Sequence, residues 1–206
     1  NSYEWTTDYV KKFSDHEDRE LSIAFQLGLD IRDDDTYTLT NQENDTVWNR
    51  NDASPLTKVI QLDYTHPVED KHTIEIGAKY IDRDMISQYS TWDEGVFTQP
   101  YEQFDYNQKV MAAYLSTKWQ LNKMWGMVAG LRLEKTQIQG QWNKQLNGEW
   151  IQNEEDTSFQ NDYLTILPNF ILSYKIDMMQ SLKFSYSKRL TRPGIYYINP
   201  NSVAND

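Results

Sequence analysis

The three histidines, His16, His66 and His72, are the side chains in this sequence best suited to act as bases or metal ligands. They show no HExxH motif or other paired spacing that would place two of them on one metal ion. All three lie in or beside segments that we predict to be short turns. We therefore interpret them as surface turn residues and predict no metal site.

Nucleophiles and cofactor motifs are also lacking. The chain has no cysteine, which excludes thiolate chemistry and disulfides. It has no GxSxG motif, no phosphate-binding loop and no dinucleotide fingerprint. The many carboxylates include no pair that is identifiable as acid and base. We predict that the protein is not an enzyme, with no catalytic residue and no cofactor.

Acidic residues dominate the charge, with a formal net charge of −11 over 206 residues. Nucleic acid binding needs clustered Lys and Arg, so this balance argues against a nucleic acid partner. The acidic runs Asp33–Asp35 and Glu154–Asp156 fall in predicted loops and are interpreted as solvated surface. Asp33–Asp35 also admits weak calcium binding, although carboxylate number alone is poor support for a shaped oxygen cage.

These residues must be positioned by strands, because apolar and polar residues alternate with period two along most of the chain. From Leu21 to Ile31, for example, every second residue is Leu, Ile or Phe, and the residues between are small or polar. A helix would scatter such residues around its axis. The same alternation, weaker in the first segment, predicts about eight strands near residues 3–13, 21–31, 60–65, 74–80, 111–121, 125–134, 169–176 and 182–187, with the last running towards Asp206.

The connections between these strands alternate in length. Short turns are predicted near 14–19, 67–71, 122–124 and 177–180, and long polar loops near 34–55, 88–106 and 143–161. Transmembrane barrels are built this way, with short periplasmic turns and long extracellular loops. No run of 18 apolar residues exists, but a barrel strand needs only about ten alternating residues to cross a membrane. The sequence predicts an all-β, antiparallel, up-and-down transmembrane barrel wall, as a single segment over residues 1–206.

Aromatic residues near both predicted rims agree with this. Phe13, Trp119 and Trp125 lie close to short turns, and a second set lies toward the long loops: Tyr37, Tyr89, Trp92, Trp142 and Trp150. Two interfacial girdles would have this pattern, although aromatic residues also favour strands in general. A soluble β-sandwich alternates in the same way, but its strands are usually about five or six residues long. Here Leu21–Tyr37 and His72–Trp92 can be read as strands more than twice that length.

Charged residues on the polar side of the strands are predicted to face the barrel interior. They are Asp30, Asp63, Glu75, Lys79, Arg132, Glu134, Lys175 and Arg189. Opposite charges on neighbouring strands can pair and hold the wall together. A hydrated solute pathway is the functional interpretation of this set, and structural pairing inside a plugged barrel is the other.

The last third of the chain carries the most specific motifs. It reads DYLTILPNFILSYK from Asp162, then SLKFSYSKRLTRP from Ser181 to Pro193, followed by Ile198, Asn199 and Pro200. This resembles the "YS-R-R-hydrophobic-x-R-P … L-N-P" signature of the Bacteroidetes outer-membrane β-barrel family, which is similar to the barrel portion of TonB-dependent receptors. NQKVMAAYLS from Asn107 and AGLRLE from Ala129 resemble the hairpin "AAYL … AGLRYE" of that family. Lys188 in place of the first Arg, Leu133 in place of an aromatic residue, and Gly194 are mild departures.

The resemblance implies a barrel of about 22 strands with an N-terminal plug. Neither the plug nor an energy-coupling box is visible in this sequence, so we expect residues 1–206 to be an internal fragment that lacks the plug and the C-terminal strands. The resemblance also implies the outer membrane of a Gram-negative bacterium, outer-membrane lipid as a partner, and possible partnership with a TonB-type system and a surface lipoprotein.

Candidate site residues follow from these interpretations. Arg132, Glu134, Arg189, Arg192 and Pro193 are candidate lumen or structural residues. Pro193 favours the end of ladder pairing, which would place Arg192 where the wall gives way to a loop. There, Arg192 would either bind a loop or plug carboxylate or remain a solvated charge at the rim. Trp92, Trp142 and Trp150 are candidate ligand-facing loop residues.

Three functions remain in competition. The first is an energy-coupled receptor barrel that imports a nutrient ligand. The second is a self-contained small barrel with a structural or adhesive role. The third is a soluble β-rich binding domain.

Overall fold

The computed structural model describes residues 1–39, 46–93, 96–97, 102–146, 149–152 and 158–192. Over these residues the chain is one antiparallel sheet with a single turn of 3-10 helix, η1, at Glu69–Lys71. Among them, no helix has the length and hydrophobicity needed to cross a membrane. The strands are β1 Ser2–Phe13, β2 His16–Asp30, β3 Arg32–Leu39, β4 Thr46–Val68, β5 His72–Asp93, β6 Val96–Phe97, β7 Glu102–Gln120, β8 Trp125–Leu146, β9 Glu149–Gln152, β10 Ser158–Lys175 and β11 Ser181–Ser187.

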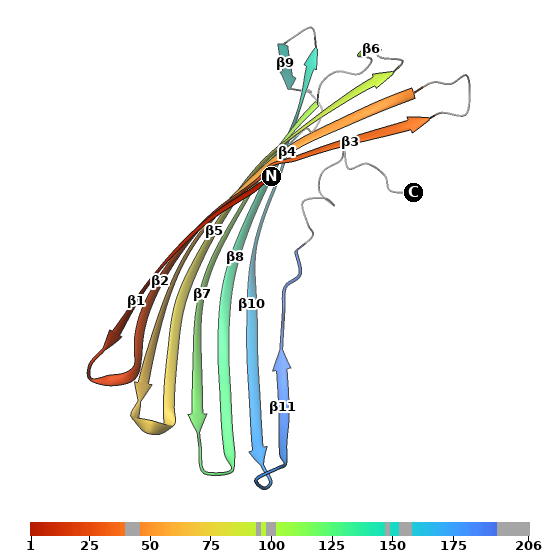
Figure 1. Cartoon of the computed structure of the whole chain (residues 1–206). Coiled ribbons are helices and arrows are strands. Elements are labelled where there is room, and N and C mark those ends of the chain that lie inside the picture. Colours follow the sequence, from red (N-terminus) through yellow and green to blue (C-terminus); the bar gives the residue numbers. More distant parts are fainter. Residues whose placement is uncertain (40–45, 94–95, 98–101, 147–148, 153–157, 193–206) are drawn as a thin grey trace.

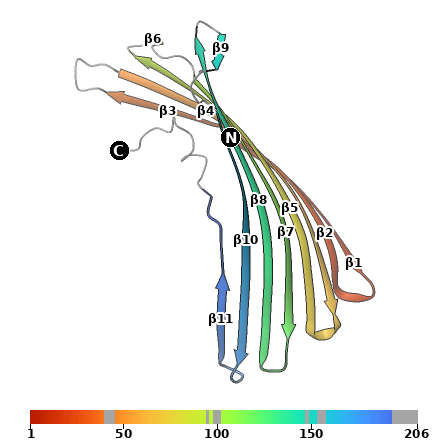
Figure 2. The ribbon, with the colours of Figure 1, turned by 180° about the vertical axis from the view of Figure 1, so that it is seen from behind.

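Eight of these strands pair in simple chain order, β1-β2-β4-β5-β7-β8-β10-β11, each antiparallel to its neighbour. The short strands β3, β6 and β9 extend single hairpins by pairing with β4, β5 and β8. Figures 1 and 2 show the result as one tall, curved and twisted wall with the short turns gathered along one rim. The predicted all-β, up-and-down architecture is confirmed.

The opposite rim differs from the prediction, because the hairpins continue far into the segments predicted as long loops. β3 and β4 pair residue by residue from Arg32↔Ala53 to Leu39↔Thr46. Likewise β5 extends to Asp93, β7 begins at Glu102, and β8 extends to Leu146. The β3–β4 extension carries polar residues at consecutive positions, Asp33–Asp35 and Asn49–Asp52, so period-two alternation does not reveal it, whereas backbone ladder bonds form regardless of side-chain polarity. The start of β7 does alternate, with Phe104 and Tyr106 as its buried residues. The predicted final strand is also shorter than expected and ends at Ser187.

The two faces of the wall are distinct, as β7 shows most clearly. Side chains at Phe104, Tyr106, Gln108, Val110 and Ala112 are buried, whereas those at the alternate positions Met111, Ala113, Leu115 and Trp119 are exposed. We call the face carrying these buried side chains the inner face and the opposite one the outer face. Alternation in the sequence predicted this division, since side chains of a strand point to opposite sides in turn.

Apolar side chains cover the lower part of the outer face in a continuous belt. On β7 it runs from Met111 to Trp119, and on β8 from Trp125 to Leu133. Each stretch measures about 26 Å along the strand, or about 20 Å along the membrane normal at the usual tilt of about 40°. This height approaches the apolar band of about 25 Å that transmembrane barrels present to lipid.

Aromatic residues mark the lower edge of this apolar belt, beside the short turns. Trp125 packs on Tyr174 with ring centroids 4.6 Å apart, and Trp119 on His72 at 5.0 Å. The second predicted girdle does not form as expected. Tyr89 and Trp142 occupy inner-face positions, and Tyr37 and Trp92 lie on strand extensions well above the belt.

Candidate functional site

An ionic cluster on the inner face brings together three of the predicted site residues. The carboxylate of Glu134 on β8 accepts two hydrogen bonds from Arg132, both at 3.0 Å, and forms an ion pair with Arg192. The Glu134 side chain is only 5% exposed, while those of Arg132 and Arg192 are 29% and 23% exposed. A carboxylate this buried is tolerated because two guanidinium groups compensate its charge.

Arg192 reaches this cluster because the chain leaves its register after β11. The β10–β11 ladder pairs Asn169 with Ser187, and the amide of Lys188 still donates to the carbonyl of Pro168 at 3.1 Å. Continued unchanged, that register would place Arg192 opposite Leu164, on the outer face. Its contacts with inner-face Glu134 and Thr136 show that the chain shifts between Lys188 and Arg192. Within the described residues the partner of Arg192 is thus a carboxylate of the wall itself, and a contact with a loop or plug carboxylate stays a prediction.

A second polar group joins the cluster from the side of β4. The hydroxyl of Tyr114 on β7 donates to Asp63, whose other carboxylate oxygen accepts from Gln61 at 2.7 Å. Tyr114 reaches across β5 at Gly77, where a Cβ atom would overlap the phenol ring. The Arg132 guanidinium lies 5.5 Å from the centre of that ring. A continuous series of polar contacts therefore crosses the wall from β4 to the segment after β11.

Beside the ionic cluster lies a groove of about 460 Å³, which we call the inner groove. Its sides are two rows of inner-face residues, Tyr114–Arg132–Leu167 and Ser116–Gly130–Asn169. Arg189, a predicted site residue, borders it and is exposed. The hydroxyl, amide and guanidinium groups of the inner groove offer hydrogen bonds to a polar solute. Among the described residues there is no cluster of three or more potential metal ligands.

Above the ionic cluster, the inner face is aromatic. Phe104 is fully buried and stacks on Trp142 with ring centroids 5.0 Å apart, and Trp142 contacts Phe159 at 5.5 Å. Met85, Tyr106 and Ile138 complete this core. Trp142 was predicted in a ligand-facing loop, but it lies in β8 and packs between other rings.

The other predicted tryptophans also lie in strands. Trp92 on β5 stacks on Trp48 at 4.2 Å, and Trp48 stacks on Tyr37 at 6.0 Å, which gives an aromatic ladder across β3, β4 and β5. The backbone of Trp150 belongs to β9, and its side chain lies outside the described residues, as does Pro193. The ligand-facing role of the three tryptophans stays a prediction.

Comparison with known proteins agrees with this architecture. The family model of the outer membrane protein beta-barrel family matches residues 11–206. The chain belongs to this family. No curated protein matches the sequence. A similar solved structure is "Crystal structure of ferric citrate transporter FecA in the unliganded form", with a TM-score of 0.59 and 14% identity over 88% of this chain and 26% of that chain.

Family membership places this chain in the outer membrane, as predicted from the sequence. Membrane lipid therefore surrounds it. The apolar belt is then the lipid-facing surface, and the ionic cluster and inner groove face the barrel interior. At 14% identity the FecA structure supports the fold alone, and this chain spans about a quarter of its length.

Sequence reasoning missed Tyr114 and Thr136 in this outer-membrane barrel. Tyr114 received no predicted role, although it is the bulky residue paired with Gly77. A large side chain directly opposite a strand glycine is a signal that one lies across the other. Thr136 is fully buried and accepts from Arg192 at 3.5 Å, a contact that depends on the register shift.

Proposed function

We propose that this chain forms part of the wall of an outer-membrane receptor that takes up a nutrient ligand through an energy-coupled, TonB-dependent mechanism. The observation that carries the proposal is the asymmetry of the wall. One face is an apolar belt, and the other carries the ionic cluster and the inner groove of about 460 Å³. A wall of this kind separates lipid from a hydrated interior.

The size of the matched region supports a large barrel over a small closed one. The structural match covers 88% of this chain and 26% of the chain of a ferric citrate transporter. On this proposal the chain is one arc of a larger barrel whose interior holds a plug, and a TonB-type system and a surface lipoprotein act as partners. Arg132 and Glu134 then stabilise the wall, and Arg189 faces the solute pathway.

Uptake by cells that carry the complete gene tests this function. We would measure accumulation of radiolabelled ferric citrate, maltohexaose and a pentapeptide, with and without a protonophore. The proposal predicts that at least one probe accumulates, and that accumulation stops when the proton gradient is dissipated. Arg189→Ala should reduce the rate while leaving the amount of folded protein unchanged.

Electrophoresis of the isolated 206-residue chain in detergent separates the alternatives. A heat-modifiable, monomeric band for this piece, combined with no uptake of any probe by the complete protein, would favour a small closed barrel. Monomeric solubility without detergent would favour a soluble domain. Either result contradicts the receptor proposal.

A further inference from the structure

Two grooves lie one above the other on the outer face of the central strands β5, β7, β8 and β10. The lower one, the apolar groove, has a volume of about 530 Å³. Its outward-facing lining includes the small residues Ala78 and Ala113, and larger residues surround them: Ile60, Leu62, Tyr80, Met111, Leu133, Lys135 and Leu164. The small side chains of the two alanines leave a depression at the top of the apolar belt.

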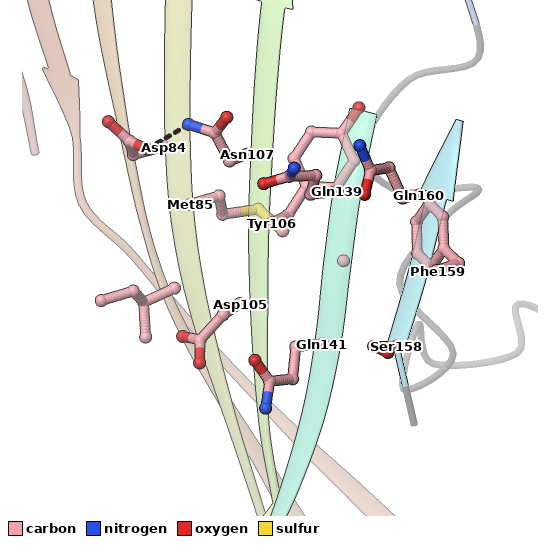
Figure 3. A pocket seen from close by; sticks show the side chains of 12 residues that line it. Asp84, Met85, Asp105, Tyr106, Asn107, Gln139, Gln141, Ser158, Phe159 and Gln160 are labelled. Atoms are coloured by element: carbon pink, nitrogen blue, oxygen red, sulfur yellow. Dashed lines mark hydrogen bonds between the residues drawn. The ribbon is translucent and has the colours of Figure 1, made fainter. Parts of the chain in front are cut away.

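The upper one, the polar groove, has a volume of about 560 Å³ and a different lining. Its outward-facing side chains are carboxylates, amides, one hydroxyl and one aliphatic side chain: Asp84, Ile86, Asp105, Asn107, Gln139, Gln141, Ser158 and Gln160. Figure 3 shows these residues converging from β5, β7, β8 and β10, with Asn107 bonded to Asp84. Such a lining offers acceptors and donors to hydroxyl and amino groups, as a sugar ring presents.

A mostly charged row separates the two grooves. Pairing aligns Lys58, Asp82, Lys109, the uncharged Gln137 and Asp162 across the five strands, directly above the upper row of the apolar groove, in which Lys135 is the charged member. Lys58 pairs with Asp84 at 3.4 Å. Lys109 and Lys135 form no ion pair with any other residue that the structure describes, so their charge is available to an anionic group at the boundary between apolar and polar surfaces.

We propose that this surface binds one glycolipid of the surrounding membrane, with an acyl chain in the apolar groove and a saccharide head group in the polar groove. Along the wall, the apolar groove is followed by a boundary that holds Lys109 and Lys135 and then by a hydrogen-bonding groove, and this order matches a lipid whose phosphorylated sugar follows its acyl chains. The carboxylates of Asp84 and Asp105 disfavour a head group that carries only phosphate. All four strands have neighbours on both sides, so the surface belongs to the interior of the wall and not to its edge.

Native mass spectrometry of the full-length protein in detergent tests the site. After delipidation we would titrate purified lipid A, which is an acylated, phosphorylated diglucosamine, against phosphatidylethanolamine. The expected result is one retained lipid A per protein, with at least tenfold preference over phosphatidylethanolamine. Equal retention of the two lipids would overturn the proposal.

Variants locate the site on this surface. Ala113→Phe fills the apolar groove and should reduce lipid A retention about tenfold, whereas Ala129→Phe, an outward alanine of the same belt outside the groove, should not. Gln139→Leu with Gln160→Leu removes amides from the polar groove and should abolish the preference for lipid A. If Ala113→Phe does not give a heat-modifiable folded band, the test rests on the lipid A preference of the Gln139→Leu, Gln160→Leu double variant. Unchanged preference in the folded variants contradicts the proposal.

Discussion

Arg192 binds the carboxylate of Glu134 from the far side of β10, so two residues 58 positions apart share one buried ion pair. Arg132 holds the same carboxylate from its own strand. The segment that follows β11 is thereby attached to β8 by a side-chain contact where the backbone ladder has ended.

Removing Arg192 should destabilise the wall, because Glu134 would remain buried with half of its compensating charge. Arg192→Ala is expected to lower the free energy of unfolding by about 3 kcal/mol. Urea unfolding in lipid vesicles, followed by tryptophan fluorescence, measures this. Arg189→Ala is the matched control, since Arg189 is exposed and forms no ion pair with a described residue; it should change stability by less than about 0.5 kcal/mol. Equal effects of the two variants would show that the ion pair contributes nothing.

Gly77→Ala should displace Tyr114, because the added methyl group overlaps its ring. We expect a loss of about 1–3 kcal/mol from overpacking and from breaking the Tyr114–Asp63 bond. Gly28→Ala is the control, since nothing lies within 4 Å of its Cβ position. The double variant Gly77→Ala with Tyr114→Ala should be no less stable than Tyr114→Ala alone. A similar loss at Gly28 and Gly77 would mean that strand flexibility, and not overlap, is responsible.

Leu115→Arg should be costly, because Leu115 lies midway along the apolar belt on β7 and is exposed to lipid. A charge at the bilayer midplane costs about 2–4 kcal/mol in transmembrane barrels. Ser116→Arg, one residue further and on the inner face, should cost much less. Unfolding of both variants in vesicles gives the comparison. A larger effect at Ser116 than at Leu115 would reverse our assignment of the two faces.

Acidic pH should destabilise the turn between β1 and β2. The hydrogen bond from Arg19 lowers the pKa of Asp15, so the ionised carboxylate is favoured in the folded state. Its contribution to stability is complete above the unfolded value of about 3.9 and disappears as pH falls through the lower folded value. Carboxyl-detected NMR titration in detergent micelles should show Asp15 titrating below the unfolded value, and Arg19→Gln should raise its pKa. An unchanged Asp15 titration in that variant would exclude Arg19 as the cause.

Much of the wall was predictable from the sequence, for a definite physical reason. Wherever one face meets lipid and the other does not, as from Leu21 to Asp30, every second residue must be apolar. That alternation also placed Arg132 and Glu134 on the inner face. The alternation is lost in β3, above the apolar belt, because water surrounds both faces there and neither face has to be apolar. Asp33–Asp35 were therefore predicted as a loop, although they belong to a strand.

The site was less accessible to prediction than the wall. Glu134 meets Arg192 only because the register changes after Lys188, and no local pattern in residues 188–192 specifies that change. Trp142 was predicted in a ligand-facing loop because it lies directly before the long polar segment near 143–161. Its burial depends on Phe104 and Phe159, which come from neighbouring strands.

The aromatic ladder above the membrane has an optical consequence. Trp48 and Trp92 stack at 4.2 Å with 24° between their planes, close enough for their excited states to couple. The near-ultraviolet circular dichroism of the protein should therefore contain a signed contribution from this one pair. Because the two indoles belong to different strands, the signal vanishes when β4 and β5 separate at their outer ends. The hairpin extension thus carries its own spectroscopic reporter, which needs no added label.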